Sequence, residues 1–189
     1  MNSILRRRRA LMAQGESYLT GYSIVGNPTI TNNVMTPNAT GWITTPAAFL
    51  PGDKPWEIIF KIKKTSNSSY QNLLTATGLL LQQVSGQNNA EWYVTASSLG
   101  DIAHLSRNFP VNQNLWCKMS FNGSVYSIGT SSDGISYSNV TKSSALAIKQ
   151  SSAVIFGAKS SNTSAVQAEY DLTQMQITID GKLWWKAVR

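Results

Sequence analysis

Two carboxyl groups near the C-terminal end of the sequence have the spacing that best fits acid–base chemistry. Glu169 and Asp171 stand two residues apart in the strand-like run EYDLTQMQITI, and a strand would place both on one face. Retaining glycoside hydrolysis requires two carboxyl groups about 5–5.5 Å apart, one acting as the acid and the other as the nucleophile. The spacing therefore raises a hydrolase hypothesis, which the neighbouring residues must decide.

The single histidine and the remaining acids offer weaker chemistry. His104 lies in GDIAHLSRN without a neighbouring Cys or second His, so it does not fit a zinc site. The sequence has no G-x-S-x-G turn for a nucleophile and no glycine-rich phosphate loop. We therefore expect His104 in a loop or in the core. Asp101, Asp133 and Asp171 are scattered and would bind calcium only if the fold brought them together. We expect no metal site and no cofactor.

Aromatic and amide side chains in the polar segments are better suited to binding than to catalysis. Binding sites for small polar molecules combine ring faces with a few hydrogen-bonding groups. Several segments, such as KTSNSSYQN, carry both kinds of side chain close together in sequence. The predicted sugar-binding residues are Tyr70, Asn72, Trp92, Tyr93 and Tyr137.

The N-terminal run SILRRRRALMAQ combines four arginines with two apolar pairs. Apolar residues recur at helical spacing, which predicts an amphipathic segment over residues 2–14 that must pack against a partner. A phosphate clamp has no use for these apolar pairs, so we expect a docking arm. The predicted anchoring residues are Ile4, Leu5, Arg6, Arg7, Arg8, Arg9, Leu11 and Met12.

The distribution of charge limits the partners of the remaining chain. The net charge is +7, and the four arginines of the arm supply more than half of it. The rest of the chain lacks the broad basic face of a nucleic-acid-binding protein. The apolar stretch after the arginines, ALMA, is shorter than the core of a secretory signal. No apolar run approaches the roughly 20 residues of a membrane helix. We therefore expect no signal peptide, no membrane contact and no nucleic-acid partner.

The elements that must position these residues are strands. In PWEIIFKIK, apolar residues alternate with polar ones from Trp56 to Ile62, and LWCKMSF places Leu115, Cys117, Met119 and Phe121 on one face. Cys117 is the only cysteine, and we expect it to be a buried, inert thiol.

Turn signals separate these predicted strands. Asn122-Gly123, Asp133-Gly134 and Asp180-Gly181 mark tight turns. Short strands joined by such turns, with no helical pattern after residue 15, predict an all-β, two-sheet antiparallel sandwich.

Four segments carry a resemblance to a known family. WITTP…PWEIIFKIK, NQNLWCKMSFNGSVYSIGTSSDGISY, IFGA and EYDLTQMQITIDGKLWWKAV follow the order found in concanavalin A-like, LamG-type jelly rolls. The resemblance implies a LamG-like jelly-roll domain over residues 18–189 behind a basic N-terminal arm or short helix over residues 1–17. Glucanases of this group carry E-x-D-x-E on one strand, whereas this sequence has Thr173 in place of the last carboxylate. The resemblance therefore does not extend to catalysis.

The arm ahead of such a domain also resembles virion proteins of phages. This resemblance implies a non-enzymatic structural protein located in the virion, on tail or head, that partners other virion proteins and its own copies. Its jelly roll would either adhere to carbohydrate on the host surface or decorate the particle. A capsid protein whose arginine-rich arm contacts nucleic acid is the alternative, and a glycan-active hydrolase is a third hypothesis that Thr173 disfavours.

Overall fold

A computed structural model describes residues 18–68, 70–96, 100–144, 146–148, 151–157 and 166–188. Within these ranges the regular elements are all strands, as the turn and alternation pattern predicts. None of the described segments forms a helix that is long and apolar enough to span a membrane. The arm and its eight predicted anchoring residues lie outside the described residues, so their docking role stays a prediction.

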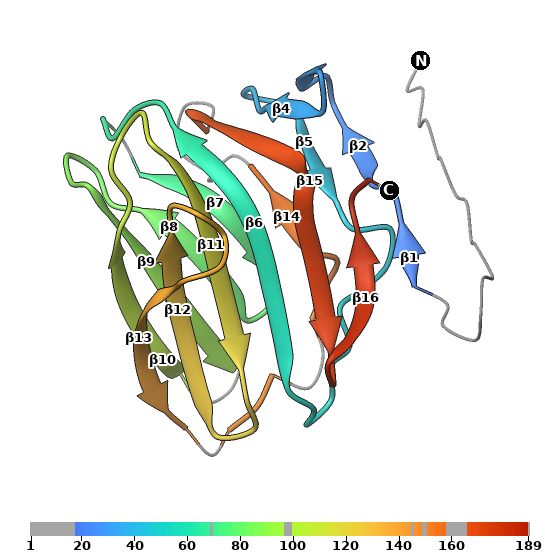
Figure 1. The fold of residues 1–189 in the computed structure, drawn as a ribbon, viewed down its shortest axis with the longest axis vertical. Coiled ribbons are helices and arrows are strands. Elements are labelled where there is room, and N and C mark those ends of the chain that lie inside the picture. Colours follow the sequence, from blue (N-terminus) through green and yellow to red (C-terminus); the bar gives the residue numbers. More distant parts are fainter. Residues whose placement is uncertain are drawn as a thin grey trace.

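The described strands form two sheets (Figure 1). Sheet A runs in the order β1–β16–β15–β6–β11–β12–β13, with β4 paired to β15 and β3 paired to β4. Its strands are β1 (Leu19–Thr20), β3 (Thr29–Thr31), β4 (Val34–Thr36), β6 (Trp56–Lys64), β11 (Asn114–Phe121), β12 (Val125–Ser131), β13 (Ser138–Ser143), β15 (Ala168–Ile179) and β16 (Lys182–Lys186).

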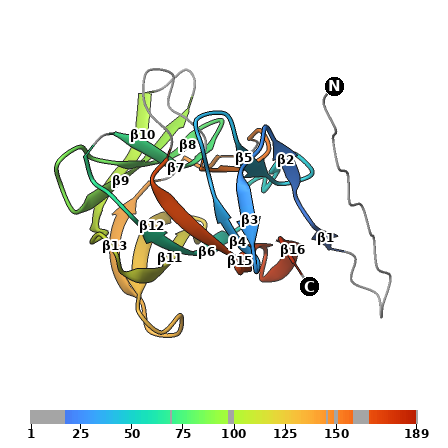
Figure 2. The same ribbon diagram turned by 90° about the horizontal axis from the view of Figure 1, so that it is seen from above.

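Sheet B runs in the order β10–β9–β8–β7–β14–β5–β2. Its strands are β2 (Ser23–Val25), β5 (Trp42–Thr44), β7 (Gln71–Ala76), β8 (Leu79–Gln83), β9 (Asn89–Ala96), β10 (Gly100–Asn108) and β14 (Ile155–Phe156). The two sheets lie face to face as two layers (Figure 2). Every pairing between these strands is antiparallel except that of β1 with β16. The predicted two-sheet antiparallel jelly-roll sandwich is confirmed.

Alternation along the central strands of sheet A produces the layered arrangement. Trp56, Ile58, Phe60 and Ile62 of β6 are buried, while the residues between them are partly exposed. Strand β11 pairs with β6 in register, and the pair Cys117–Phe60 faces inward. One face of each strand therefore forms the core and the other forms the outer surface of sheet A.

The core is rich in aromatic rings packed edge to face. The rings of Trp56, Trp92 and Tyr126 contact one another at centroid distances of 5.8–6.3 Å. On the other side of the core, Phe156 stacks on Trp185 at 5.9 Å. Burying a large apolar side chain stabilises a fold by about 1.5–3 kcal/mol, so these rings are major contributors to stability.

The C-terminal hairpin forms as its turn dipeptide predicts. Asp180 and Gly181 alone connect β15 to β16, with φ of 56° and 72°. Two consecutive positive φ values define the type I′ turn that matches the twist of a hairpin. Of the two tryptophans that follow, Trp185 is fully buried, whereas Trp184 is partly buried and packs against Phe49.

Candidate functional site

The predicted sugar-binding residues are distributed over both sheets. Asn72 on β7 and Tyr93 on β9 are partly exposed on the outer face of sheet B. Tyr70 immediately precedes β7, and its side chain is exposed. Tyr137 instead immediately precedes β13 of sheet A, and its ring lies beneath the ammonium of Lys118.

Trp92 requires a correction. Its side chain is fully buried in the core, so its ring cannot stack on a sugar. The physical reason is the alternation along β9, in which Ala90, Trp92 and Val94 point inward and Glu91 and Tyr93 point outward. A run of two aromatic residues in a strand always divides between the two faces, and here Tyr93 is the outer one.

The histidine prediction is also wrong. His104 lies neither in a loop nor in the core but on strand β10, directly opposite Tyr93. The side chain of His104 is 48% exposed, and its ring stacks on that of Tyr93 with centroids 4.4 Å apart and planes 13° apart. The only histidine of the chain therefore forms half of a ring pair on the surface of sheet B.

Hydrogen-bonding groups border this ring pair. Glu91 Oε2 accepts a hydrogen bond from the hydroxyl of Tyr93 and lies 3.4 Å from His104 Nε2. On the adjoining strands, Gln82 Nε2 donates to Asn72 Oδ1 at 3.1 Å. We name these five residues, Asn72, Gln82, Glu91, Tyr93 and His104, the sheet B patch.

The register of four neighbouring strands assembles the sheet B patch. Asn72 of β7 pairs with Gln82 of β8, and Gln82 pairs with Glu91 of β9. Tyr93 is two residues further along β9, on the same face, and pairs with His104 of β10. The patch is therefore carried by a hydrogen-bonded sheet and not by loops, so its groups are held in fixed relative positions.

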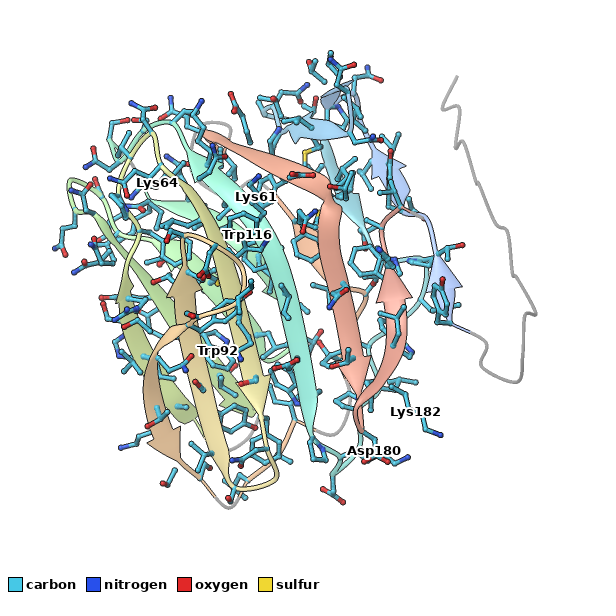
Figure 3. All side chains as sticks on the ribbon, viewed as in Figure 1. Lys61, Lys64, Trp92, Trp116, Asp180 and Lys182 are labelled. Atoms are coloured by element: carbon cyan, nitrogen blue, oxygen red, sulfur yellow. The ribbon has the colours of Figure 1, made fainter. Side chains whose placement is uncertain are left out.

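On the outer face of sheet A, lysine side chains contact the aromatic rings and the carboxylates of neighbouring strands. Lys61 Nζ lies 4.7 Å from the ring centroid of Trp116 and 3.5 Å from Asp171 Oδ2. Figure 3 shows Lys61 and Trp116 side by side on β6 and β11. A parallel arrangement places Lys118 Nζ 4.6 Å from the centroid of Tyr137 and 3.6 Å from Glu57 Oε2. An ammonium group therefore lies over the ring of Trp116 and another over the ring of Tyr137, where a ligand would otherwise stack.

Glu169 and Asp171, the two acids behind the hydrolase hypothesis, lie on this outer face of sheet A. Glu169 Oε2 lies 3.4 Å from Lys63 Nζ, and Asp171 is paired with Lys61. Thr173, which replaces the third carboxylate, donates its backbone N–H and its hydroxyl to Asp171 Oδ1. Both acids are thus engaged by neighbouring lysines, and Asp171 is further held by Thr173.

Two side chains in the segment between β12 and β13 have strongly shifted pKa values. Asp133 accepts hydrogen bonds from the Ser131 hydroxyl and from the backbone of Ile135 and Ser136, which lowers its pKa to about 2. Burial raises the pKa of Tyr137 to about 12. Both groups therefore keep one charge state near neutral pH. Among the described residues, no three His, Cys, Asp or Glu side chains come together as a metal site.

Sequence reasoning missed several of these residues. Gln82, Glu91 and His104 join the sheet B patch only through the pairing of β8, β9 and β10, which no local pattern encodes. Trp116 carried a readable signal, since it falls on the polar face of LWCKMSF, opposite Cys117 and Met119.

Comparisons with known proteins identify the fold. No family model matches the chain, and no curated protein sequence matches it. Among solved structures, the receptor-binding domain of botulinum neurotoxin C/D mosaic serotype is similar with a TM-score of 0.66 at 11% identity, covering 87% of this chain and 45% of that one.

Two further solved structures give the same result. The botulinum neurotoxin serotype D binding domain matches with a TM-score of 0.65 at 12% identity over 93% of this chain and 49% of that one. The binding domain of botulinum neurotoxin DC in complex with rat synaptotagmin II matches with a TM-score of 0.60 at 11% identity over 89% and 46%. This chain thus spans about half the length of these neighbours, and the likeness shows a shared sandwich fold.

Proposed function

We propose that the protein is a non-enzymatic virion protein of a phage, which displays its sandwich to bind carbohydrate on a host surface through the sheet B patch. The observation that carries the binding role is the stacked pair of Tyr93 and His104, which the carboxylate of Glu91 borders, with two hydrogen-bonded amides on the next two strands of the same sheet. Ring faces combined with a few fixed polar groups are what small polar ligands require.

Two further considerations support a binding role over a catalytic one. The sandwich neighbours belong to receptor-binding domains of other proteins, although this chain corresponds to about half of each. The paired acids Glu169 and Asp171 are engaged by lysines and by Thr173. The virion location rests on the resemblance of the basic arm and the closing strand pair to phage proteins.

A single site of this kind would bind weakly, because it is formed by the surface of a sheet and not by a deep cavity. Many copies on one particle would raise the apparent affinity through avidity, without any new contact. We therefore expect the protein to work as an array, and binding must be measured with the protein displayed in many copies.

The test is a glycan microarray probed with the full chain coupled to fluorescent beads. The double variant Tyr93→Ala/His104→Ala should lose bead retention by about tenfold or more, because multivalent display multiplies the loss of affinity at each site. Trp116→Ala, which truncates a partly buried ring on the opposite sheet, is the matched control and should retain binding.

Three outcomes can be distinguished. Loss of retention in the double variant alone supports the sheet B patch. Equal loss in Trp116→Ala would move the binding surface to sheet A. Failure of the wild-type beads to bind any glycan would overturn the adhesion role and leave particle decoration.

A further inference from the structure

The two sheets differ sharply in their basic residues. All lysines that lie in described strands belong to sheet A, namely Lys61, Lys63, Lys64, Lys118, Lys142, Lys182 and Lys186. The strands of sheet B, as described, contain no lysine and a single arginine, Arg107. Arg107 is directed toward sheet A, where its Nε donates to Thr130 Oγ1 of β12 at 3.1 Å.

The outer face of sheet B therefore offers little to an anionic ligand. Within its described side chains, the sheet B patch contains one acidic side chain, Glu91, which lies beside the imidazole of His104, and it contains no lysine or arginine. A sulfate, phosphate or uronate group bound here would lie close to Glu91 without a lysine or arginine of the described strands to pair with it. Like charges at such distances repel, most strongly where water is partly excluded.

The same groups match a neutral, hydroxyl-rich ligand. A carboxylate accepts several hydrogen bonds and can receive two neighbouring hydroxyl groups of one sugar ring. The amides of Gln82 and Asn72 provide both donors and acceptors, and a sugar hydroxyl acts in either role. The exposed ring of His104 supplies an apolar surface for the C–H face of a pyranose.

Sheet A carries the lysines that could attract an anionic ligand, but those at the centre of its outer face are already paired. Lys61, Lys63 and Lys118 are paired with Asp171, Glu169 and Glu57 at 3.4–3.6 Å. To bind one of these lysines, an anionic ligand would have to displace its carboxylate partner. That partner belongs to the same chain and is always close by. The part of sheet A formed by β6 and β11 is therefore a poor competitor for acidic polysaccharides despite its lysines.

We infer that the sheet B patch selects neutral, hydroxyl-rich polysaccharides and rejects anionic ones. This inference rests on the proposed carbohydrate-binding function and adds the chemical class of the ligand. It assigns the selection to Glu91, as the hydroxyl acceptor that also repels anions, and to the lack of lysine on the described outer face of sheet B.

The experiment measures retention of full-chain beads on two groups of immobilised polymers. The neutral polymers are mannan, galactan and dextran, and the anionic ones are hyaluronate, polygalacturonate and poly(glycerol phosphate). The arginines of the arm can bind anions by themselves, so each protein is also measured with Arg6–Arg9 replaced by serine. Salt is kept at about 0.3 M, where the Debye length is below about 8 Å.

Beads that carry the wild-type protein should be retained on at least one neutral polymer at least tenfold more strongly than on any anionic polymer. We call this quotient the neutral-to-anionic ratio. Gln82→Lys keeps a donor for Asn72 Oδ1 but adds a cation beside Glu91, and should reduce this ratio at least tenfold. Gln176→Lys adds the same charge to a partly exposed position on β15 of sheet A, and should leave the ratio unchanged.

The contrary results separate the two proposals. Preferential retention on anionic polymers by the arginine-free protein would overturn the inference and leave the carbohydrate-binding function standing. An equal effect of Gln82→Lys and Gln176→Lys would also overturn it, because the selection would then be a property of overall charge. Retention on no polymer and no microarray glycan would overturn both.

Discussion

At the scale of single residues, the most unusual side chain is a lysine inside the sandwich. Lys64 ends β6 with 1% of its surface exposed, and its ammonium donates to Gln83 Oε1 at 2.5 Å. Gln83, also fully buried, in turn donates to the backbone carbonyl groups of Val84 and Gln87. A small polar network thus accompanies the buried charge, as buried polar groups require.

Lys64 should make stability depend on pH in the alkaline range. Burial lowers its pKa from 10.5 to about 8, so between these values the unfolded chain binds a proton that the folded chain has released. The free energy of unfolding should therefore rise with pH over this interval, by roughly 3 kcal/mol at most, since one pKa unit corresponds to 1.36 kcal/mol. Below about pH 8 the cost of the buried charge is fully present.

Urea denaturation at pH 7, 9 and 10.5 would measure this contribution. Lys64→Met should flatten the rise relative to wild type, whereas Lys63→Met, at the neighbouring outward position, should retain it. Identical pH profiles for wild type and Lys64→Met would show that Lys64 keeps its ordinary pKa in the folded protein.

Cys117 should be chemically silent in the native protein. Its thiol is fully buried on β11, and burial raises its pKa well above the usual range, so the reactive thiolate is scarcely populated. Iodoacetamide at pH 8 should label less than a few per cent of native protein and all of the protein in denaturant, as read by intact mass. Rapid native labelling would contradict the assignment of Cys117 to the core.

At the scale of elements, sheet B depends on a very short central strand. Strand β14 comprises only Ile155 and Phe156, yet it pairs with both β7 and β5. Gly157 ends it with φ of +79°, and a Cβ at this position would lie 2.3 Å from Cγ of Pro37. Gly157 therefore has two reasons to be glycine, its left-handed backbone conformation and the close approach of Pro37.

Gly157→Ala should accordingly be more damaging than an alanine at a comparable open turn. Gly181 has a similar φ of +72° but no atom within 4 Å of its ideal Cβ, so Gly181→Ala isolates the backbone strain of about 1–2 kcal/mol. Gly157→Ala should add about 1–3 kcal/mol for the clash with a rigid proline ring. Thermal or urea unfolding of both variants measures the difference, and equal losses would refute the steric argument.

The elements that the sequence could predict were those with one buried face. Strands β6 and β11 alternate cleanly because sheet A has one face in the core and one in water, and the type I′ turn is encoded by Asp180-Gly181 itself. Strand β13, SNVTKS, lies at the edge of sheet A and is almost wholly exposed, so it has no hydrophobic pattern to detect.

Strand β10 shows why the site was harder to predict than the fold. It is the edge strand of sheet B, and its sequence GDIAHLSRN contains few residues that favour strands. Placing His104 beside Tyr93 requires the register between β9 and β10, which depends on long-range packing. The presence of Tyr93 in the candidate site was foreseeable, but its neighbours in the sheet B patch were not.

At the scale of the whole molecule, the arm and the sandwich have separate tasks in the proposed function. The buried apolar cluster of the described residues is formed by the two sheets and by connecting residues such as Phe49 and Val154. Deleting residues 1–14 should therefore leave a folded, soluble protein with an unchanged melting temperature to within a few degrees. The same deletion should abolish joining to the particle or to other copies.

Circular dichroism and sedimentation, followed by incorporation into assembled particles, would test the arm. Leu5→Asp/Leu11→Asp should reproduce the deletion, because apolar burial of about 1.5–3 kcal/mol per side chain is expected to hold the arm in place. Normal assembly of the truncated protein would refute the docking role. Loss of nucleic-acid packaging on removal of the arginines alone would favour the capsid alternative.

The parallel pairing of β1 with β16 has a consequence for the orientation of the protein on a surface. Leu19 pairs with Trp185, so the chain enters and leaves the sandwich at the same edge of sheet A (Figure 1). The strands that carry Tyr93 and His104 lie at the other end of the strand order, where β10 contacts β12 and β13. At about 4.8 Å per strand, β9 is some 24 Å across sheet B from β2. A particle attached to the molecule at the paired strands β1 and β16 would therefore hold the ring pair at the far side of the sandwich, exposed to a facing surface.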